Sequence, residues 1–136
     1  AARSQMAEGF AKYYSQKVKN WEVEIYSAGT HIANHIMPEA ITAMKELDID
    51  ISSQYPKTLK QIPGEFDLLF TMGCNVDCPY LPSKYRQDWG LDDPVGMPAD
   101  FYRKTRDKIN LKVKTLFQII ESSNNVEQII RKLEKT

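Results

Sequence analysis

Apolar residues recur every three or four positions along several segments of the chain, which is the spacing of helices that bury one face. The first such segment covers residues 5–19 and follows Ser4, whose hydroxyl suits the N-cap of a helix. A second segment begins at Pro38, a residue favoured in the first turn of a helix. A long segment begins near Ala99, and an additional short one at about residues 126–136 ends the chain. The pattern therefore predicts a helix at each of these places.

Other segments have the composition of strands. Residues 22–27 alternate charged and apolar positions, which is typical of a strand with one solvated face. Residues 66–72 are almost continuously apolar, as in the central strand of a parallel sheet that helices cover on both faces. Residues 85–89 predict the last strand, and residues 58–62 predict one helical turn or two. This alternation predicts an α/β sandwich, and the length fits a single domain over residues 1–136.

Composition excludes several classes of partner. The 18 basic and 18 acidic residues cancel, so no net field favours nucleic acid or an anionic membrane. No apolar run has the length of a membrane span, and no signal-peptide pattern opens the sequence. The two cysteines are too few for the disulfide scaffold of a secreted domain. We therefore expect a cytoplasmic protein without a membrane or nucleic-acid partner.

The start of the first helical segment has the composition of an anion site. Arg3 and Ser4 stand where the free N–H groups of a helix N-terminus and a guanidinium can converge on a tetrahedral oxyanion. A solvated arginine beside a plain N-cap serine is the alternative.

Cys74 and Cys78 lie in a predicted loop over residues 73–83. Thiols this close together can relay a disulfide, whereas two inert buried thiols are the alternative. His31 and His35 have the same spacing, but the two pairs come from different loops, so zinc binding is disfavoured and no bound metal is expected.

The opening sequence Ala-Arg-Ser-Gln-Met-Ala-Glu-Gly-Phe resembles the second half of the Cys-x5-Arg-Ser phosphate-binding loop of the low-molecular-weight protein tyrosine phosphatase superfamily, and more closely its arsenate reductases. The resemblance extends to Tyr-Ser-Ala-Gly-Thr at residues 26–30 and Asp-Trp-Gly-Leu-Asp-Asp-Pro at residues 88–94. It implies a phosphotyrosine protein phosphatase I-like fold, a three-layer sandwich around a small four-stranded parallel sheet. The first strand and the nucleophilic cysteine, four residues before Ala1, would then precede this sequence, which is inactive as written.

The resemblance also implies roles for residues that are present. Arg3 and Ser4 would bind the oxyanion, and Ser4 would lower the pKa of the nucleophilic thiol. Asp93, directly before a proline, would be the general acid, with Asp92 as the competing candidate. Cys74 and Cys78 would carry a disulfide onward to an external thiol: thioredoxin, mycothiol or a glutathione-type thiol. No bound cofactor is implied.

Three functions follow from these residues. The first is reduction of arsenate to arsenite. The second is phosphomonoester hydrolysis by a tyrosine phosphatase, although Val95, Gly96 and Met97 replace the aromatic residues that such enzymes carry after Asp-Pro. The third is binding of arsenate, phosphate or sulfate without catalysis, because the nucleophile lies outside the sequence.

Overall fold

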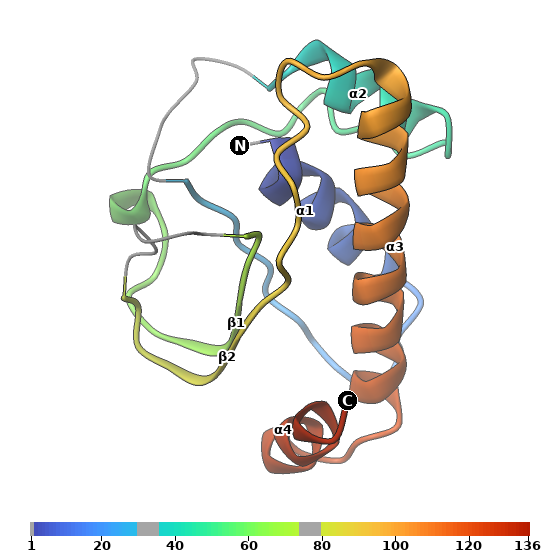
Figure 1. Ribbon diagram of the computed structural model, residues 1–136. Helices are drawn as coiled ribbons and strands as arrows, with labels where there is room; N and C mark the ends of the chain where they lie inside the picture. Colours follow the sequence, from blue (N-terminus) through green and yellow to red (C-terminus); the bar gives the residue numbers. More distant parts are fainter. Residues whose placement is uncertain (1, 30–35, 74–79) are drawn as a thin grey trace.

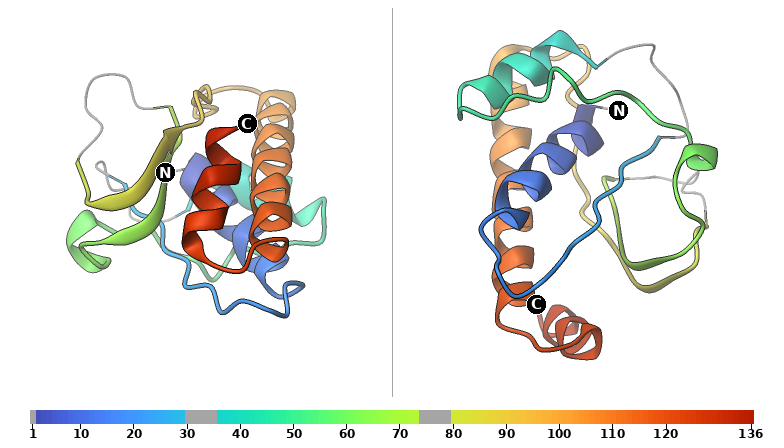
Figure 2. Two further views of the ribbon diagram at one scale, coloured as in Figure 1. Left: turned by 90° about the horizontal axis from the view of Figure 1, so that it is seen from below. Right: turned by 180° about the vertical axis from the view of Figure 1, so that it is seen from behind.

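The computed structural model describes residues 2–29, 36–73 and 80–136. The elements in these ranges are α1 (Ala2–Ser15), α2 (Pro38–Lys45), the 3₁₀ turn η1 (Leu59–Gln61), β1 (Phe66–Thr71), β2 (Ser83–Asp88), α3 (Ala99–Glu121) and α4 (Val126–Glu134). Helix α3 runs along the molecule, α2 packs near its N-terminal end, α1 crosses its middle, and α4 folds back at its C-terminal end (Figure 1). The two strands lie on the other side of α1 from α3 (Figure 2). The predicted α/β architecture is confirmed.

Helix α1 lies at the centre of the described structure because its inner face is apolar. Met6 and Phe10 are almost fully buried. A Cβ added at Gly9 would lie 2.6 Å from a side-chain carbon of Ile51, so the missing side chain lets the helix approach the neighbouring segment closely. The helix already includes Ala2, so Ser4 lies inside its first turn and the predicted N-cap is wrong. Its last residue is Ser15, four residues earlier than predicted.

The sheet of the described residues is a parallel pair. β1 pairs with β2 in the register Phe66↔Ser83 and Leu68↔Tyr85. Apart from the exposed Asp67, the side chains of β1 are half-buried rather than fully buried, because the cavity described below runs along the strand.

The predicted strand at residues 22–27 is wrong as a sheet element. Exposure alternates along residues 21–27 as the sequence pattern predicts, and the chain there is neither helix nor turn. However, no hydrogen-bond ladder joins it to another strand within the described ranges. The alternation therefore marks which side chains face inward, but a strand also needs a backbone partner beside it. Two of the four expected strands are present among the described residues.

The other helices begin as the sequence predicts. Pro38 opens α2, and α3 starts at Ala99, directly after Pro98. The side chain of Asn125 caps α4 by accepting a hydrogen bond from the backbone N–H of Gln128 at 2.9 Å. No described helix combines the length and the apolar composition that a bilayer span requires.

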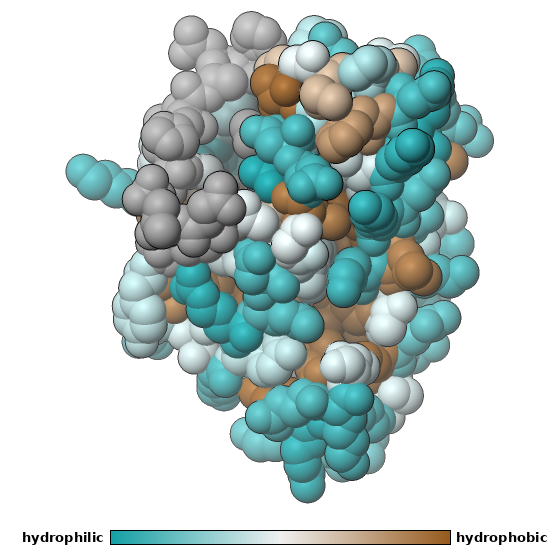
Figure 3. Space-filling view, in the orientation of Figure 1, coloured by the Kyte–Doolittle hydropathy of each residue, from teal (hydrophilic) through white to brown (hydrophobic). Residues whose placement is uncertain are grey.

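The space-filling view is hydrophilic over most of the visible face, with hydrophobic residues at its upper end and along its centre (Figure 3). Val95 and Met97 are among the exposed hydrophobic residues. Both follow Asp93 closely in the sequence, so the loop that carries this carboxylate exposes aliphatic side chains directly after Pro94.

Candidate active site

A cavity of about 1,070 Å³ lies between α1, residues 21–29, β1 and α3. Arg3, Ser4 and Asp93 all contribute to its lining, although α1 and the loop after β2 supply them separately. Asp92 is absent from this lining. The fold thus brings three of the sequence-predicted residues to one cavity.

The guanidinium of Arg3 is fixed by one of its nitrogens. Nη1 donates to the carbonyl oxygens of Met72 and Leu91, each at 2.6 Å. Within the described residues, Nε and Nη2 make no hydrogen bond, so two adjacent N–H-bearing nitrogens are available to a ligand. Two such donors in one plane match two oxygens of a tetrahedral anion.

Gly73 makes this position of Arg3 sterically possible. Its φ is +104°, in the region that L side chains rarely adopt. A Cβ there would collide with the carbonyl oxygen of Leu91 and would lie 2.9 Å from Nη1 of Arg3. The sequence indicates only a glycine after a strand, and its role depends on this close approach.

Asp88, the last residue of β2, joins the ends of both strands. Its Oδ1 accepts from the hydroxyl of Thr71 at 2.6 Å and from the backbone N–H of Gly73 at 2.9 Å. Its Oδ2 accepts from the backbone N–H of Gly90 at 3.1 Å. One carboxylate therefore holds both backbone segments that surround Arg3, a role that the sequence motif does not reveal.

Asp93 lies in a loop with buried anchors. Its carboxylate is exposed, and Oδ1 accepts from the backbone N–H of Val95 at 3.1 Å. Leu91 and Pro94 on either side are buried, so they fix the backbone while the carboxylate remains accessible. An exposed carboxyl group at the cavity can exchange a proton with a bound group.

Glu8 is a buried charge that sequence reasoning missed. Its carboxylate accepts from Lys12 Nζ at 2.7 Å, from Lys57 Nζ at 3.3 Å and from the hydroxyl of Ser27. Burial raises the pKa of Glu8, but the hydrogen bonds from Lys12 and Ser27 and the charge of Lys57 outweigh it, so the pKa lies below its ordinary value. Glu8 ties residues 21–29, one wall of the cavity, to α1. In the sequence, the feature that could have indicated this buried charge is an acidic residue on the inner face of an amphipathic helix.

The sequence of the chain matches a known protein family. The model of the family described as low molecular weight phosphotyrosine protein phosphatase matches residues 1–129. The chain belongs to this family. The predicted fold is confirmed.

Several proteins that are similar to this chain in sequence or structure are arsenate reductases, which confirms the predicted relationship. Arsenate reductase 2 of Staphylococcus haemolyticus is 38% identical over 119 residues, which cover 85% of this chain and 87% of that protein. Arsenate reductase of Staphylococcus aureus strain Newman is 39% identical over 120 residues, covering 84% and 86%. A solved structure of an arsenate reductase in the phosphate binding state has a TM-score of 0.73 and 31% identity, covering 85% of this chain and 88% of that one.

The other residues that the sequence analysis considered for the site are Cys74, Cys78, His31 and His35. They lie outside the described residues. Within the described part of the chain, no three His, Cys, Asp or Glu residues form a group that could hold a metal ion.

Proposed function

We propose that the protein reduces arsenate to arsenite with electrons from thiols. One observation carries this proposal: Arg3 and Asp93 line the same cavity in a chain whose relatives at 38–39% identity are arsenate reductases. In this assignment Arg3 and Ser4 bind the oxyanion, and Asp93 is the general acid. The attacking thiolate belongs to the cysteine expected four residues before Ala1.

The residues divide the reaction into two steps. In the first, the thiolate attacks arsenic(V) to form a sulfur–arsenic bond, and Asp93 gives a proton to the oxygen that leaves as water. Nε and Nη2 of Arg3 stabilise the negative charge on the remaining oxygens. In the second, a thiolate from Cys74 or Cys78 attacks the sulfur of that bond, and the two sulfurs form a disulfide. The electron pair of the sulfur–arsenic bond stays on arsenic, which leaves as arsenite.

Regeneration requires an external reductant. A disulfide that includes Cys74 or Cys78 must receive two electrons from another thiol. Thioredoxin, mycothiol and a glutathione-type thiol are the candidate donors, and no bound cofactor takes part in this scheme. We place the protein in the cytoplasm, where such thiols are kept reduced.

Phosphomonoester hydrolysis is the second candidate function. The same oxyanion site and general acid would serve both reactions, and one relative was solved in a phosphate binding state. The residues after Asp93 and Pro94 favour reduction, because Val95 and Met97 expose aliphatic rather than aromatic surface for a phosphotyrosine ring.

Arsenite production by the full-length protein tests the proposal. We expect turnover with at least one of the three donors, and loss of multiple turnover in the double variant Cys74→Ser/Cys78→Ser. Hydrolysis of p-nitrophenyl phosphate provides the control, because it needs no second thiol and should persist in this variant. Unchanged arsenite production in the double variant would rule out the relay. Absence of arsenite with every donor would contradict arsenate reduction itself.

A further inference from the structure

A single peptide group lies between two opposite charges. The carbonyl oxygen of Met72 accepts from Nη1 of Arg3 at 2.6 Å. The N–H of the same peptide, which belongs to Gly73, donates to Oδ1 of Asp88 at 2.9 Å. In a trans peptide the C=O and N–H point in opposite directions, so the guanidinium and the carboxylate lie at the two ends of one dipole. Each charge favours the orientation that the other one needs.

The Leu91 carbonyl, which is the second acceptor for Arg3, lies next to a residue that is bound by the same Asp88 carboxylate. Leu91 accepts from Nη1 of Arg3 at 2.6 Å, and the adjacent Gly90 donates its N–H to Oδ2 of Asp88 at 3.1 Å. Both glycines have positive φ, +104° at Gly73 and +59° at Gly90, so each turns sharply beside Asp88. The two oxygens of Asp88 thus hold the two turns from which Arg3 is bound.

If Asp88 only stabilised the sheet, a contact between the two strands would be sufficient. The hydrogen bond from Thr71 to Oδ1 of Asp88, at 2.6 Å, would by itself join the C-terminal ends of β1 and β2. The two glycine contacts lie beyond the strands, next to the Met72 and Leu91 carbonyl groups that accept from Arg3. They form charge-assisted hydrogen bonds, which are stronger than neutral ones.

We propose that Asp88 is a positioning residue for oxyanion binding. It acts through the peptide between Met72 and Gly73 and through the turn at Gly90, and it fixes the plane in which Arg3 offers Nε and Nη2. This inference rests on the proposed function only in taking Arg3 as the oxyanion ligand, and it does not depend on reduction.

Binding of inorganic phosphate tests this role on the full-length protein. Asp88→Asn keeps the side-chain shape but removes the charge and can serve only one of the two turns with its single oxygen. We expect the phosphate Kd in calorimetry to rise roughly tenfold, the scale of losing a charge-assisted hydrogen bond. Asp100→Asn is the matched control: it removes an exposed carboxylate of α3 that pairs with Arg103 at 2.7 Å and lies outside the cavity lining, so the Kd should not change.

A double-mutant cycle separates positioning from general destabilisation. If Asp88 acts through Arg3, Asp88→Asn should add little to the loss already caused by Arg3→Ala. Additive losses, or a lower Tm with an unchanged Kd, would overturn the proposal. Absence of phosphate binding by the unmodified protein would overturn it too, whereas phosphate binding without arsenite production would contradict only the proposed reduction.

The unmodified protein provides a test that does not depend on folding of a variant. Phosphate should shift the NMR resonances of the Gly73 and Gly90 amide protons and of the Asp88 carboxyl carbon together with the Arg3 Nε–H. A shift confined to Arg3 would show that Asp88 is not coupled to the anion and would contradict the inference.

Discussion

Nη1 of Arg3 lies 2.6 Å from the carbonyl oxygen of Leu91, a residue 88 positions away in the sequence. This contact joins the first turn of α1 to the loop that carries Asp93. It places a cation that can bind an oxyanion and a carboxyl group that can transfer a proton at the same cavity.

The choice between the two adjacent aspartates can be tested directly. Asp93 lines the cavity and Asp92 does not. We expect Asp93→Asn to lower kcat for p-nitrophenyl phosphate and for arsenate by about 100-fold or more, because the leaving oxygen loses its proton donor. Asp92→Asn, the matched control, should remain within a few-fold of the unmodified protein. Equal losses in the two variants, measured from pH 5 to pH 9, would show that neither acts as the general acid.

The glycine after β1 should not tolerate a side chain. Gly73→Ala introduces a Cβ that collides with the Leu91 carbonyl and crowds Arg3 at a φ of +104°. We expect the free energy of unfolding to fall by about 1–3 kcal/mol and phosphate affinity to fall with it. Gly64→Ala is the control, because nothing lies within 4 Å of its Cβ position. Urea unfolding and calorimetry measure the two effects, and a Gly73→Ala protein that binds phosphate normally would contradict the described position of Arg3.

Removing the Glu8 charge should weaken the wall of the cavity. Glu8→Gln leaves Lys57, whose side chain is 15% exposed, without its carboxylate partner. We expect a loss of about 2 kcal/mol in the free energy of unfolding.

The pH dependence of this loss has a definite sign. The pKa of Glu8 is lower in the folded protein than its ordinary value of 4.5, so its contribution is present above that value and decreases as pH falls. The difference in Tm between the two proteins should therefore shrink on acidification. A constant difference from pH 7 to pH 3 would contradict the charge as its cause.

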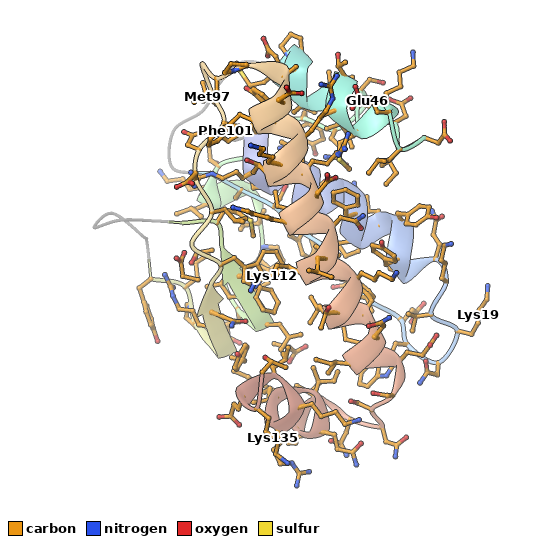
Figure 4. The ribbon with its side chains drawn as sticks, turned by 45° about the vertical axis from the view of Figure 1, so that its right-hand side comes forward. Lys19, Glu46, Met97, Phe101, Lys112 and Lys135 are labelled. Atoms are coloured by element: carbon orange, nitrogen blue, oxygen red, sulfur yellow. The ribbon has the colours of Figure 1, made fainter. Side chains whose placement is uncertain are left out.

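A second carboxylate, that of Glu46, links the end of α2 to α3 at a place away from the cavity. Glu46, just after α2, lies beside α3 (Figure 4) and accepts from Arg103 and Arg106. The hydrogen bonds from these two arginines lower the pKa of Glu46 from 4.5 to about 2. Its contribution to stability is therefore complete above pH 4.5 and is lost as pH falls toward about 2.

The Glu46→Gln variant should therefore differ from the unmodified protein in its Tm at pH 6 and converge with it near pH 2. Thermal unfolding by circular dichroism across this range measures the convergence. Parallel Tm curves would show that the pKa of Glu46 is not lowered by folding. Phosphate affinity should be unaffected, because Glu46 is not part of the cavity lining.

Local patterns were sufficient to predict most of the helices. Pro38 and the apolar spacing predict α2, and the long periodic segment from Ala99 predicts α3, because both signals depend on neighbouring residues. The same kind of pattern fails at residues 22–27, where a strand also requires a partner that no local signal supplies.

The site was predictable only where a motif carries it. Arg3 and Asp93 follow from resemblance to a family, and the structure brings both to one cavity. The roles of Gly73, Asp88 and Glu8 depend on contacts between segments that are distant in the sequence, such as the hydrogen bond between Glu8 and Lys57, 49 positions apart. Spacing and composition contain no information about such contacts.

The most direct test is the conversion of arsenate by the full-length protein in the presence of thioredoxin and its reductase, with mycothiol- and glutathione-coupled systems in parallel. The account predicts that arsenite accumulates over many turnovers per enzyme, and that Arg3→Ala abolishes this accumulation. Rapid hydrolysis of a phosphotyrosine peptide without any arsenite from arsenate would contradict it.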